Sequence, residues 1–507
     1  MNTFKPMLLS TLKGYNSAQF IKDVTAGIIV AIIALPLSIA LALASGVGPE
    51  AGIFTAIVAG FVISVLGGSA VQISGPTAAF ATIVAGIVAE SGTDGLMMAT
   101  ILAGIILIIM GICRLGTLIK FIPFSITTGF TSGIAVTIVI GQLKDFTGIA
   151  YPEGVRPVET MEKLELFFHC ISTVNMHAVL VGVVSLAILI ISPKFFKRIP
   201  GSLLAVIGGI LMVQFLPLNV YTIGDLYTIS NSLPSLYIPA FKWGMIGDAL
   251  PNAITIAVLA SMESLLSCVV ADGMIGSKHH SNTELIAQGA GNVASALFGG
   301  IPATGAIART AANIKNGGRT PIAGMVHSIT LVLVLVVLMP YAGLIPMPTI
   351  AAILFMVAYN MCQWRTFVHM LKTSPKTDIS ILVVTFTLTV VFDLVVAIEV
   401  GMLITCIMFL KRMSDETTLH EWTHEDNNEN EHHIFNLPKE LHVYDITGPL
   451  FFGDVNILEN INITEHTRCL IIRLSAVPSI DTTSMNALTE LHEKCKRENR
   501  DIFLPKK

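Results

Sequence analysis

The chain has 507 residues, of which 53% are hydrophobic and 13% are charged, and its formal net charge is −4. A soluble domain carries about 25% charged residues, so this composition cannot supply the polar surface of a soluble protein. The mean hydropathy of +0.75 favours an integral membrane protein with many helices. The sequence has no basic stripe, which argues against a nucleic-acid partner.

The apolar part of the chain extends from residue 24 to about 411. We predict fourteen membrane-spanning segments at 24–45, 51–67, 77–91, 96–113, 117–142, 174–192, 199–216, 249–271, 285–299, 305–315, 321–340, 347–360, 378–392 and 394–410. With the N-terminal stretch 1–23 in the cytoplasm, the cytoplasmic loops carry eleven Lys and Arg residues and the opposite loops carry four. This bias follows the positive-inside rule, and an even number of spans places the C-terminus in the cytoplasm as well.

Two similar strings, SGPTAA at 74–79 and IPATGA at 301–306, indicate an internal repeat. Each string combines Gly, Pro and Thr and leads into an unusually short apolar stretch. The separation in sequence between Asp23 and Asp248 is nearly the same as the separation between Pro76 and Pro302 of the two strings. Seven spans per repeat is an odd number, so the second repeat is inverted in the membrane. Matched, interrupted segments in two inverted halves point to the central site of a transporter.

Such interrupted segments can bind an anion. A helix that starts inside the membrane has unpaired N–H groups and a partial positive charge in its first turn. We expect these starts near Thr77, Ala78, Ala79 and Phe80, and near Gly305, Ala306, Ile307 and Ala308. Two such ends that face each other form an anion site. For either string alone, a kink or a small-residue packing face is the alternative.

Two charged residues lie within the predicted spans. Arg309 is about one turn into the second short helix, where it adds positive charge for an anionic substrate or pairs with a carboxylate. Glu263 lies in the middle of the eighth span, and three roles remain open for it. It takes up a proton, as carboxyl groups away from water do; it binds Na⁺ together with Ser267 one turn further; or it pairs structurally with Arg309.

Catalytic motifs are missing from the sequence, which contains no Ser-His-Asp triad signature, phosphate loop or HExxH. We therefore do not expect an enzyme. His279 and His280 are adjacent but have no partner carboxylates in a metal-ligand spacing, so no metal site or cofactor is expected.

The composition changes abruptly after Arg412. Residues 413–433 are rich in charged and polar residues and form an expected aqueous linker. Residues 434–507 alternate like a small soluble α/β domain, with expected strands in 442–453 and 469–474. A helix is expected at 484–497, with Asp481 or Thr482 as its N-cap.

The membrane part resembles the SulP family, the bacterial relatives of the solute carrier 26 anion transporters, over nearly all of 20–412. The matching strings are 36–42, 46–49, 74–77, 263–266, 284–289, 298–310 and 392–401. The resemblance implies an all-α, polytopic, UraA-like fold of two inverted seven-span repeats. Spans 1–4 and 8–11 would form a core domain, and spans 5–7 and 12–14 a gate domain. It also implies a homodimer and an anion carried between spans 3 and 10 by an elevator motion.

The resemblance also implies site residues. The family's ligand contacts fall on the positions of Thr77, Gly305, Ala306, Ala308 and Arg309. The acid that matches Glu263 is linked to coupling. Sodium–bicarbonate members have a Thr on span 10 where this chain has Ile307, so one oxygen ligand of a hard-cation site is missing here. Proton coupling is therefore favoured over sodium coupling.

The C-terminal module, 434–507, resembles a STAS domain that lies in the cytoplasm. The chain stops soon after 502–504, so the family's last strand–helix portion is expected to be missing.

The predicted function is secondary active transport of a small anion across the bacterial inner membrane. Sulfate is the first candidate, followed by bicarbonate or a dicarboxylate. Sodium-coupled bicarbonate uptake is an alternative. A nucleobase carrier of the same fold would need an acid on span 10, where this chain offers Arg309. An anion channel, or a sensor that signals through the STAS module, is the third class.

Overall fold

The computed structural model comprises two compact units, Met1–Val400 and Gly401–Lys507. The described residues are 4–117, 123–152, 155, 157, 159–195, 200–230, 232–237, 243–392, 394–422, 438, 440–454, 457–458, 461, 463 and 466–504. At 243–245, 394–399, 402 and 454 the description covers the backbone alone.

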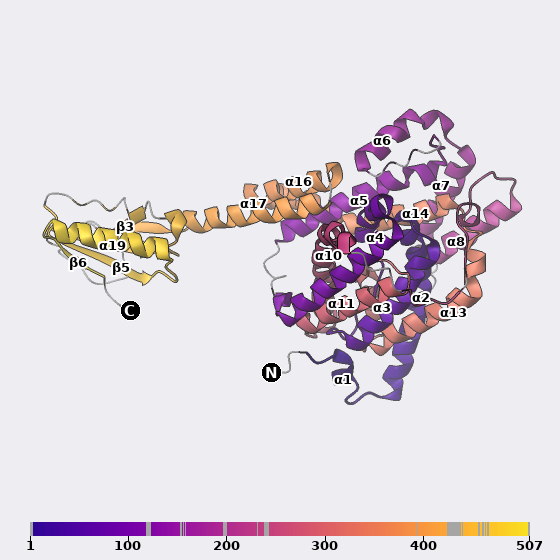
Figure 1. Cartoon of the computed structure of the whole chain (residues 1–507), viewed down its shortest axis with the longest axis horizontal. Helices are drawn as coiled ribbons and strands as arrows, with labels where there is room; N and C mark the ends of the chain where they lie inside the picture. Colours follow the sequence, from indigo (N-terminus) through magenta and orange to yellow (C-terminus); the bar gives the residue numbers. More distant parts are fainter. Residues whose placement is uncertain are drawn as a thin grey trace. The chain divides into compact units, whose positions relative to one another are not determined.

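The first unit is built almost entirely of helices (Figure 1). Its elements up to the middle of the chain are α1 (Met7–Thr11), α2 (Ser17–Ala44), α3 (Pro49–Leu66), β1 (Ser74–Gly75), α4 (Ala78–Ile112), α5 (Phe124–Thr147), α6 (Thr160–His169), η2 (Ile171–Thr173), α7 (Met176–Phe195), α8 (Gly201–Phe215) and α9 (Ile223–Leu226). The later elements are α10 (Trp243–Ile275), α11 (Ser281–Leu297), β2 (Thr304–Gly305), α12 (Ile307–Lys315), α13 (Ile322–Ala342), α14 (Met347–Cys362), α15 (Trp364–Thr373), α16 (Lys376–Val391) and α17 (Leu394–Asp415), which continues into the second unit.

Each of the fourteen predicted segments overlaps a helix, while residues 118–122 of the fifth segment and residue 199 of the seventh lie outside the described residues. The third and fourth segments both fall in α4, which Gly92 divides with a left-handed φ of 68°. Within the described ranges, eight helices are long and apolar enough to cross a membrane. Several of the others, such as α12, are shorter than the ~20 residues that span a bilayer. The count of fourteen crossings stays a prediction. The short helices α6 and α15 lie between predicted spans and were not expected from the hydropathy pattern.

The helices of this unit pack in two groups. In the first group, α11 packs against α3 and α4, α10 packs against α4 and α12, and α13 packs against α2 and α3. In the second group, α5 packs against α14 and α16, and α7 packs against α8 and α14. The labels of α3, α4, α10 and α11 accordingly lie close together in Figure 1. The first group contains both short strands and both helices that follow them.

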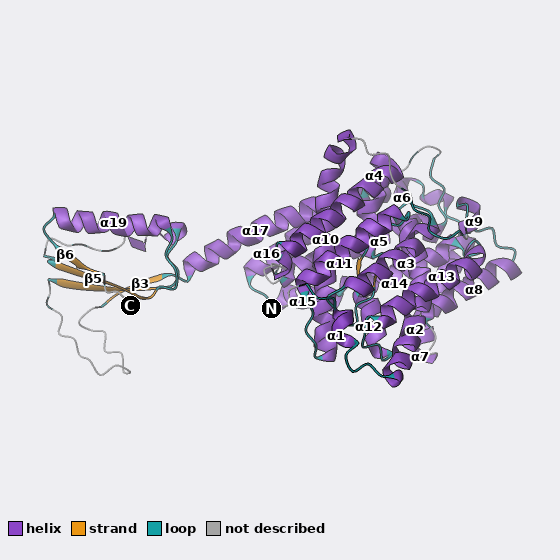
Figure 2. Cartoon of the chain, turned by 60° about the horizontal axis from the view of Figure 1, so that its bottom comes forward, coloured by secondary structure: helices purple, strands orange, loops and turns teal. Residues whose placement is uncertain are grey.

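The second unit is a small α/β domain. It contains β3 (Thr418–Glu421), β4 (Leu441–Thr447), η3 (Phe452–Asp454), β5 (Cys469–Ala476), α19 (Thr482–Arg497) and β6 (Asp501–Phe503). The sheet order is β3-β4-β5-β6, with β3 antiparallel to β4 and the other pairs parallel. Figure 2 shows α19 along one face of this sheet. Tyr444, Ile472 and Leu488 are buried between them.

The predicted helix and the strand predicted in 469–474 are confirmed as α19 and β5. The strand predicted in 442–453 is shorter than expected, because β4 ends at Thr447 and Phe452–Asp454 forms the 3-10 turn η3. Asp481 is the N-cap, and its carboxylate accepts a hydrogen bond from the backbone N–H of Ser484 at 2.8 Å. The first part of the predicted linker at 413–433 is wrong, because it is structured. Helix α17 continues to Asp415, and Thr418–Glu421 form strand β3, which pairs with β4. The remainder of the predicted linker, 423–433, lies outside the described residues.

Candidate functional site

The two interrupted segments meet in a short antiparallel strand pair, the crossing. Ser74 pairs with Gly305 and Gly75 pairs with Thr304. The backbone N–H of Ala306 extends the pair by donating to the carbonyl oxygen of Ile73 at 2.9 Å. Figure 2 shows these short strands in orange among the helices of the first unit. Because the strands are antiparallel, α4 and α12 leave the crossing in opposite directions, and their N-termini flank it.

The N-termini of α4 and α12 have no side-chain cap. The N-cap of α4 is Thr77 and that of α12 is Ala306, and neither side chain accepts a hydrogen bond from its helix. By contrast, Asn16 caps α2 through its side chain. The first N–H groups of the two half-helices are therefore not capped by Thr77 or Ala306, which leaves them available to an anion.

The predicted site residues all lie at or next to the crossing, but they differ in exposure. Ala78, Ala79 and Phe80 are buried in the first turn of α4, and Gly305 and Ala306 are buried on the other side. Ile307 is 37% exposed, and Ala308 is exposed as well. The accessible side of the crossing is thus the first turn of α12.

Arg309 is buried beside the crossing with little to satisfy its charge. Its side chain is 1% exposed. Nη2 donates to the carbonyl oxygen of Pro76 at 3.2 Å and to Ser38 Oγ at 3.4 Å, while Nε and Nη1 have no hydrogen-bond partner. Among the residues that the structure describes, the ion pairs do not include Arg309. The structure therefore does not show the alternative ion pair between Arg309 and Glu263.

Glu263 and its neighbour Ser264 attach α10 to both interrupted segments. Thr77 Oγ1 donates to Glu263 Oε2 at 2.9 Å. Ser264 Oγ accepts from the backbone N–H of Gly305 at 3.0 Å and lies 2.7 Å from Thr304 Oγ1. Ser267, one turn further along α10, has its hydroxyl 3.5 Å from Thr310 Oγ1.

A row of polar side chains on α11 holds both interrupted segments by hydrogen bonds. The sequence analysis assigned no role to these side chains. Glu284 is buried, and its carboxylate accepts from the backbone N–H of Gly68, from Gln72 Nε2 and from Gln288 Nε2 at 2.8 to 2.9 Å. Gln288 also donates to Ser74 Oγ at 3.1 Å. One turn further, Asn292 exchanges hydrogen bonds with both backbone groups of Ala303.

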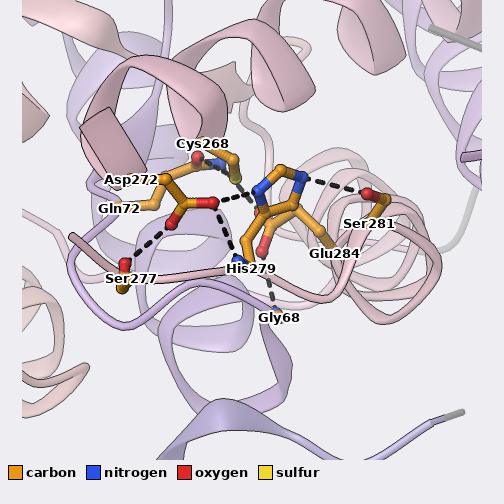
Figure 3. A network of polar contacts seen from close by, with 8 residues as sticks. All are labelled: Gly68, Gln72, Cys268, Asp272, Ser277, His279, Ser281 and Glu284. Carbon is orange, nitrogen blue, oxygen red and sulfur yellow. Dashed lines mark hydrogen bonds and ion pairs between the residues drawn. The ribbon is translucent and has the colours of Figure 1, made fainter. Parts of the chain in front are cut away.

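This row of side chains has a sequence signal, because Glu284, Gln288 and Asn292 recur every four residues in an otherwise apolar segment. Such spacing places the three side chains on one face of a helix. Figure 3 shows the Glu284 end of this network with Gln72, Gly68 and Cys268.

His279 has a carboxylate partner that the sequence did not reveal. Its Nδ1 lies 2.7 Å from Asp272 Oδ2, and its Nε2 lies 2.9 Å from Ser281 Oγ (Figure 3). The expectation that no carboxylate lies near His279 is therefore wrong, because the turn after α10 folds back on the last turn of that helix. One carboxylate and one hydroxyl hold the imidazole at the α10–α11 turn.

Comparison with known families gives two matches on this chain. The model described as the sulfate permease family matches residues 20–385, and the STAS domain model matches residues 436–505. The putative sulfate transporter YvdB of Bacillus subtilis (strain 168) is 40% identical over 97% of this chain and 92% of its own length. The bicarbonate transporter BicA of Picosynechococcus sp. (strain ATCC 27264 / PCC 7002 / PR-6) is 30% identical over 95% of this chain and 88% of its own length.

Solved structures show the same fold. The transmembrane domain of a cyanobacterium bicarbonate transporter BicA matches with a TM-score of 0.68 and 30% identity, covering 76% of this chain and 98% of that chain. The overall structure of SLC26A9 matches with a TM-score of 0.85 and 18% identity, covering 98% of this chain and 86% of that chain.

Proposed function

Because the chain belongs to the sulfate permease family, whose members are transporters, we propose that it is a secondary active transporter of a small oxyanion. Family membership confirms the predicted resemblance, the helical polytopic membrane fold, the STAS domain and the class of transporter rather than enzyme. The proposal further names the substrate, the coupling ion and the residues that bind them.

The crossing carries this proposal. Two uncapped helix N-termini flank one strand pair, and each presents N–H groups and a partial positive charge. The buried guanidinium of Arg309 adds positive charge, and no ion pair among the described residues includes it. A cation inside a membrane segment is costly and usually functional. A bound anion supplies the missing counter-charge, with the exposed first turn of α12 as its point of contact.

Sulfate is the proposed substrate, with bicarbonate or a dicarboxylate next. Backbone N–H groups and one guanidinium select charge and size, and all three ligands are small oxygen-bearing anions. The relative that is 40% identical is named a putative sulfate transporter, whereas the relative named a bicarbonate transporter is 30% identical. This order of identity favours sulfate.

We propose a proton as the coupling ion, with Glu263 as its carrier. Its carboxyl group lies against Thr77, at the tip of α4 where an anion would bind. A Na⁺ site needs several oxygen ligands, but the side chain of Ile307 offers none, and the Ser267 hydroxyl lies next to Thr310. Sodium-coupled bicarbonate uptake is the second candidate, favoured by the position of Glu263 and Ser267 one turn apart on α10.

Transport is proposed to follow an elevator motion of a homodimer in the bacterial inner membrane, with both chain ends in the cytoplasm. One group of helices surrounds the crossing and would move as a unit: α2 to α4 and α10 to α13. It would move against a second group, which comprises α5, α7, α8, α14, α16 and α17. Inverted repeats with a site at the broken helices are typical of such carriers.

Uptake into proteoliposomes tests the proposal. The purified full-length chain is reconstituted, and labelled sulfate, bicarbonate and fumarate are offered while proton and sodium gradients are imposed separately. We expect sulfate uptake that follows the proton gradient, is lost in Arg309→Ala, and is unchanged in Arg365→Ala, an exposed arginine on α15. Uptake that follows only the sodium gradient, a channel-like conductance, or full activity of Arg309→Ala would contradict it.

A further inference from the structure

We propose that an apolar pocket between α2, α8 and α13 binds the acyl chain of a membrane lipid. The pocket has a volume of about 260 Å³. Its walls include Ile39 of α2, Val206 and Ile207 of α8, and Val334 and Met339 of α13. Every lining residue is apolar except Tyr341, so the pocket offers almost no partner for a polar ligand.

The pocket has a buried floor and an exposed rim. On the floor, Ile39 and Val206 are buried and Met339 is only 2% exposed. On the rim, Ile207 and Leu338 are both exposed. The opening therefore lies on the outer surface of α8 and α13. The rest of that outer surface is apolar too, since these helices expose residues such as Phe215 and Leu333.

We infer that a lipid acyl chain occupies the pocket, because its rim is continuous with the exposed apolar surface of α8 and α13. The chain is a multi-pass membrane protein, so the exposed apolar faces of α8 and α13 contact lipid. Ordered water needs two or more polar partners, which this pocket does not provide. An empty pocket would leave its lining without dispersion contacts. An acyl chain from the surrounding bilayer is apolar, thin and flexible, and it enters without crossing a polar barrier.

The position of the pocket gives a bound lipid a regulatory role. α2 and α13 pack in the helix group that contains the crossing, whereas α8 packs against α7 and α14 in the other group. Under the elevator motion of the proposed function, on which this step rests, α8 shifts against α2 and α13 and the pocket changes shape. A ligand that binds one arrangement more tightly shifts the equilibrium toward it. Lipid composition would then alter the transport rate.

Photo-crosslinking tests the site itself. The full-length chain is reconstituted in vesicles of phosphatidylethanolamine and phosphatidylglycerol with a trace of phosphatidylcholine that bears a diazirine on one acyl chain. After irradiation, mass spectrometry locates the lipid adducts. We expect adducts on Met339 and Ile39, which lipid on the ordinary outer surface cannot reach because both are buried.

Two valines on α13 provide a matched pair of variants. Val334 lines the pocket, whereas Val337, one turn further, does not line it and is 62% exposed. We expect Val334→Trp to reduce the Met339 adduct several-fold by filling the pocket, and Val337→Trp to leave it unchanged. Leu203→Trp fills the pocket from α8 and serves if the first variant does not fold.

The proposal would be overturned by adducts confined to exposed residues such as Leu333, or by a Met339 adduct that persists when the pocket is filled. Sulfate uptake, measured on the same vesicles, is a separate readout. A protein that binds the lipid probe but does not transport sulfate would refute the proposed function and leave the lipid site intact. The opposite result would refute the lipid site alone.

Discussion

Thr77 Oγ1 donates a 2.9 Å hydrogen bond to Glu263 Oε2, which joins the N-cap of α4 to the middle of α10 across 186 residues of sequence. The Thr77 hydroxyl is therefore turned to the carboxyl group of α10 and does not cap its own helix. A negative charge on Glu263 would repel an anion at the tip of α4, and a proton on Glu263 removes that repulsion. Under the proposed function, a proton on Glu263 would favour anion binding, and a bound anion would favour protonation of Glu263.

Replacing Glu263 by Gln separates anion binding from proton coupling. The amide oxygen of Glu263→Gln can still accept the hydrogen bond of Thr77, but the side chain no longer binds a proton. We expect sulfate–sulfate exchange to continue and proton-driven net uptake to be lost. Counterflow and gradient-driven uptake of labelled sulfate measure the two activities. Glu90→Gln, at an exposed position of α4, is the control, and gradient-driven uptake at the normal rate in Glu263→Gln would contradict the assignment.

Gly75 leaves space for the guanidinium of Arg309. A Cβ atom at this position would lie 2.6 Å from Nη1 of Arg309, closer than van der Waals contact allows. We expect Gly75→Ala to displace Arg309 and to raise the KM for sulfate at least several-fold. Gly86→Ala, further along α4, adds a Cβ with no heavy atom within 4 Å and should leave KM unchanged. Equal KM values in the two variants would argue that Arg309 does not need its observed position.

Glu284 is expected to stabilise the segment that leads into the crossing. Its carboxylate accepts three hydrogen bonds, from N–H groups of Gly68, Gln72 and Gln288. Glu284→Gln replaces one accepting oxygen with an NH₂ group, which would face one or more of these N–H donors. Hydrogen bonds to a charged group contribute about 1.5–3 kcal/mol each, so the variant should lose about 2 kcal/mol of stability or more. Thermal unfolding in detergent measures the loss. The same Glu90→Gln control should unfold like the natural chain, and an unchanged midpoint for Glu284→Gln would refute this role.

Asp481 makes the stability of α19 dependent on pH. The backbone N–H of Ser484, and also that of Phe452, donates to its carboxylate and lowers its pKa below the ordinary value. A lowered pKa in the folded state stabilises the helix above the unfolded-state pKa of about 3.9. That stabilisation is lost as the pH falls through the lower, folded-state value.

Hydrogen exchange of the full-length chain measures this effect. We expect Asp481→Ala to reduce protection of the α19 amides at neutral pH, and acidification of the natural chain to have the same effect. Glu490→Ala, at an exposed position in the same helix, should reduce protection less. Protection that does not differ between the two variants would contradict the capping role.

Local features of the sequence were sufficient to locate the main membrane helices, but not the short helices α6 and α15 or the strand β3. Runs of apolar residues determine where helices form in a membrane, because backbone groups there must be hydrogen-bonded within the segment. Pro76 and Pro302 locate the two interruptions because a proline has no N–H to continue a helix. Each predicted segment therefore overlaps a helix, and the predicted starts near Thr77 and Gly305 lie within two residues of the observed ones.

The contacts that shape the candidate site depend on the tertiary structure. The pairing of Ser74 with Gly305, the bond from Thr77 to Glu263 and the three donors around Glu284 all join segments far apart in the chain. Hydropathy and spacing report on one segment at a time, so they left open whether Arg309 pairs with Glu263. Only the packing of α10 and α12 around the crossing decided that Glu263 bonds to Thr77 and that Arg309 forms no ion pair with it.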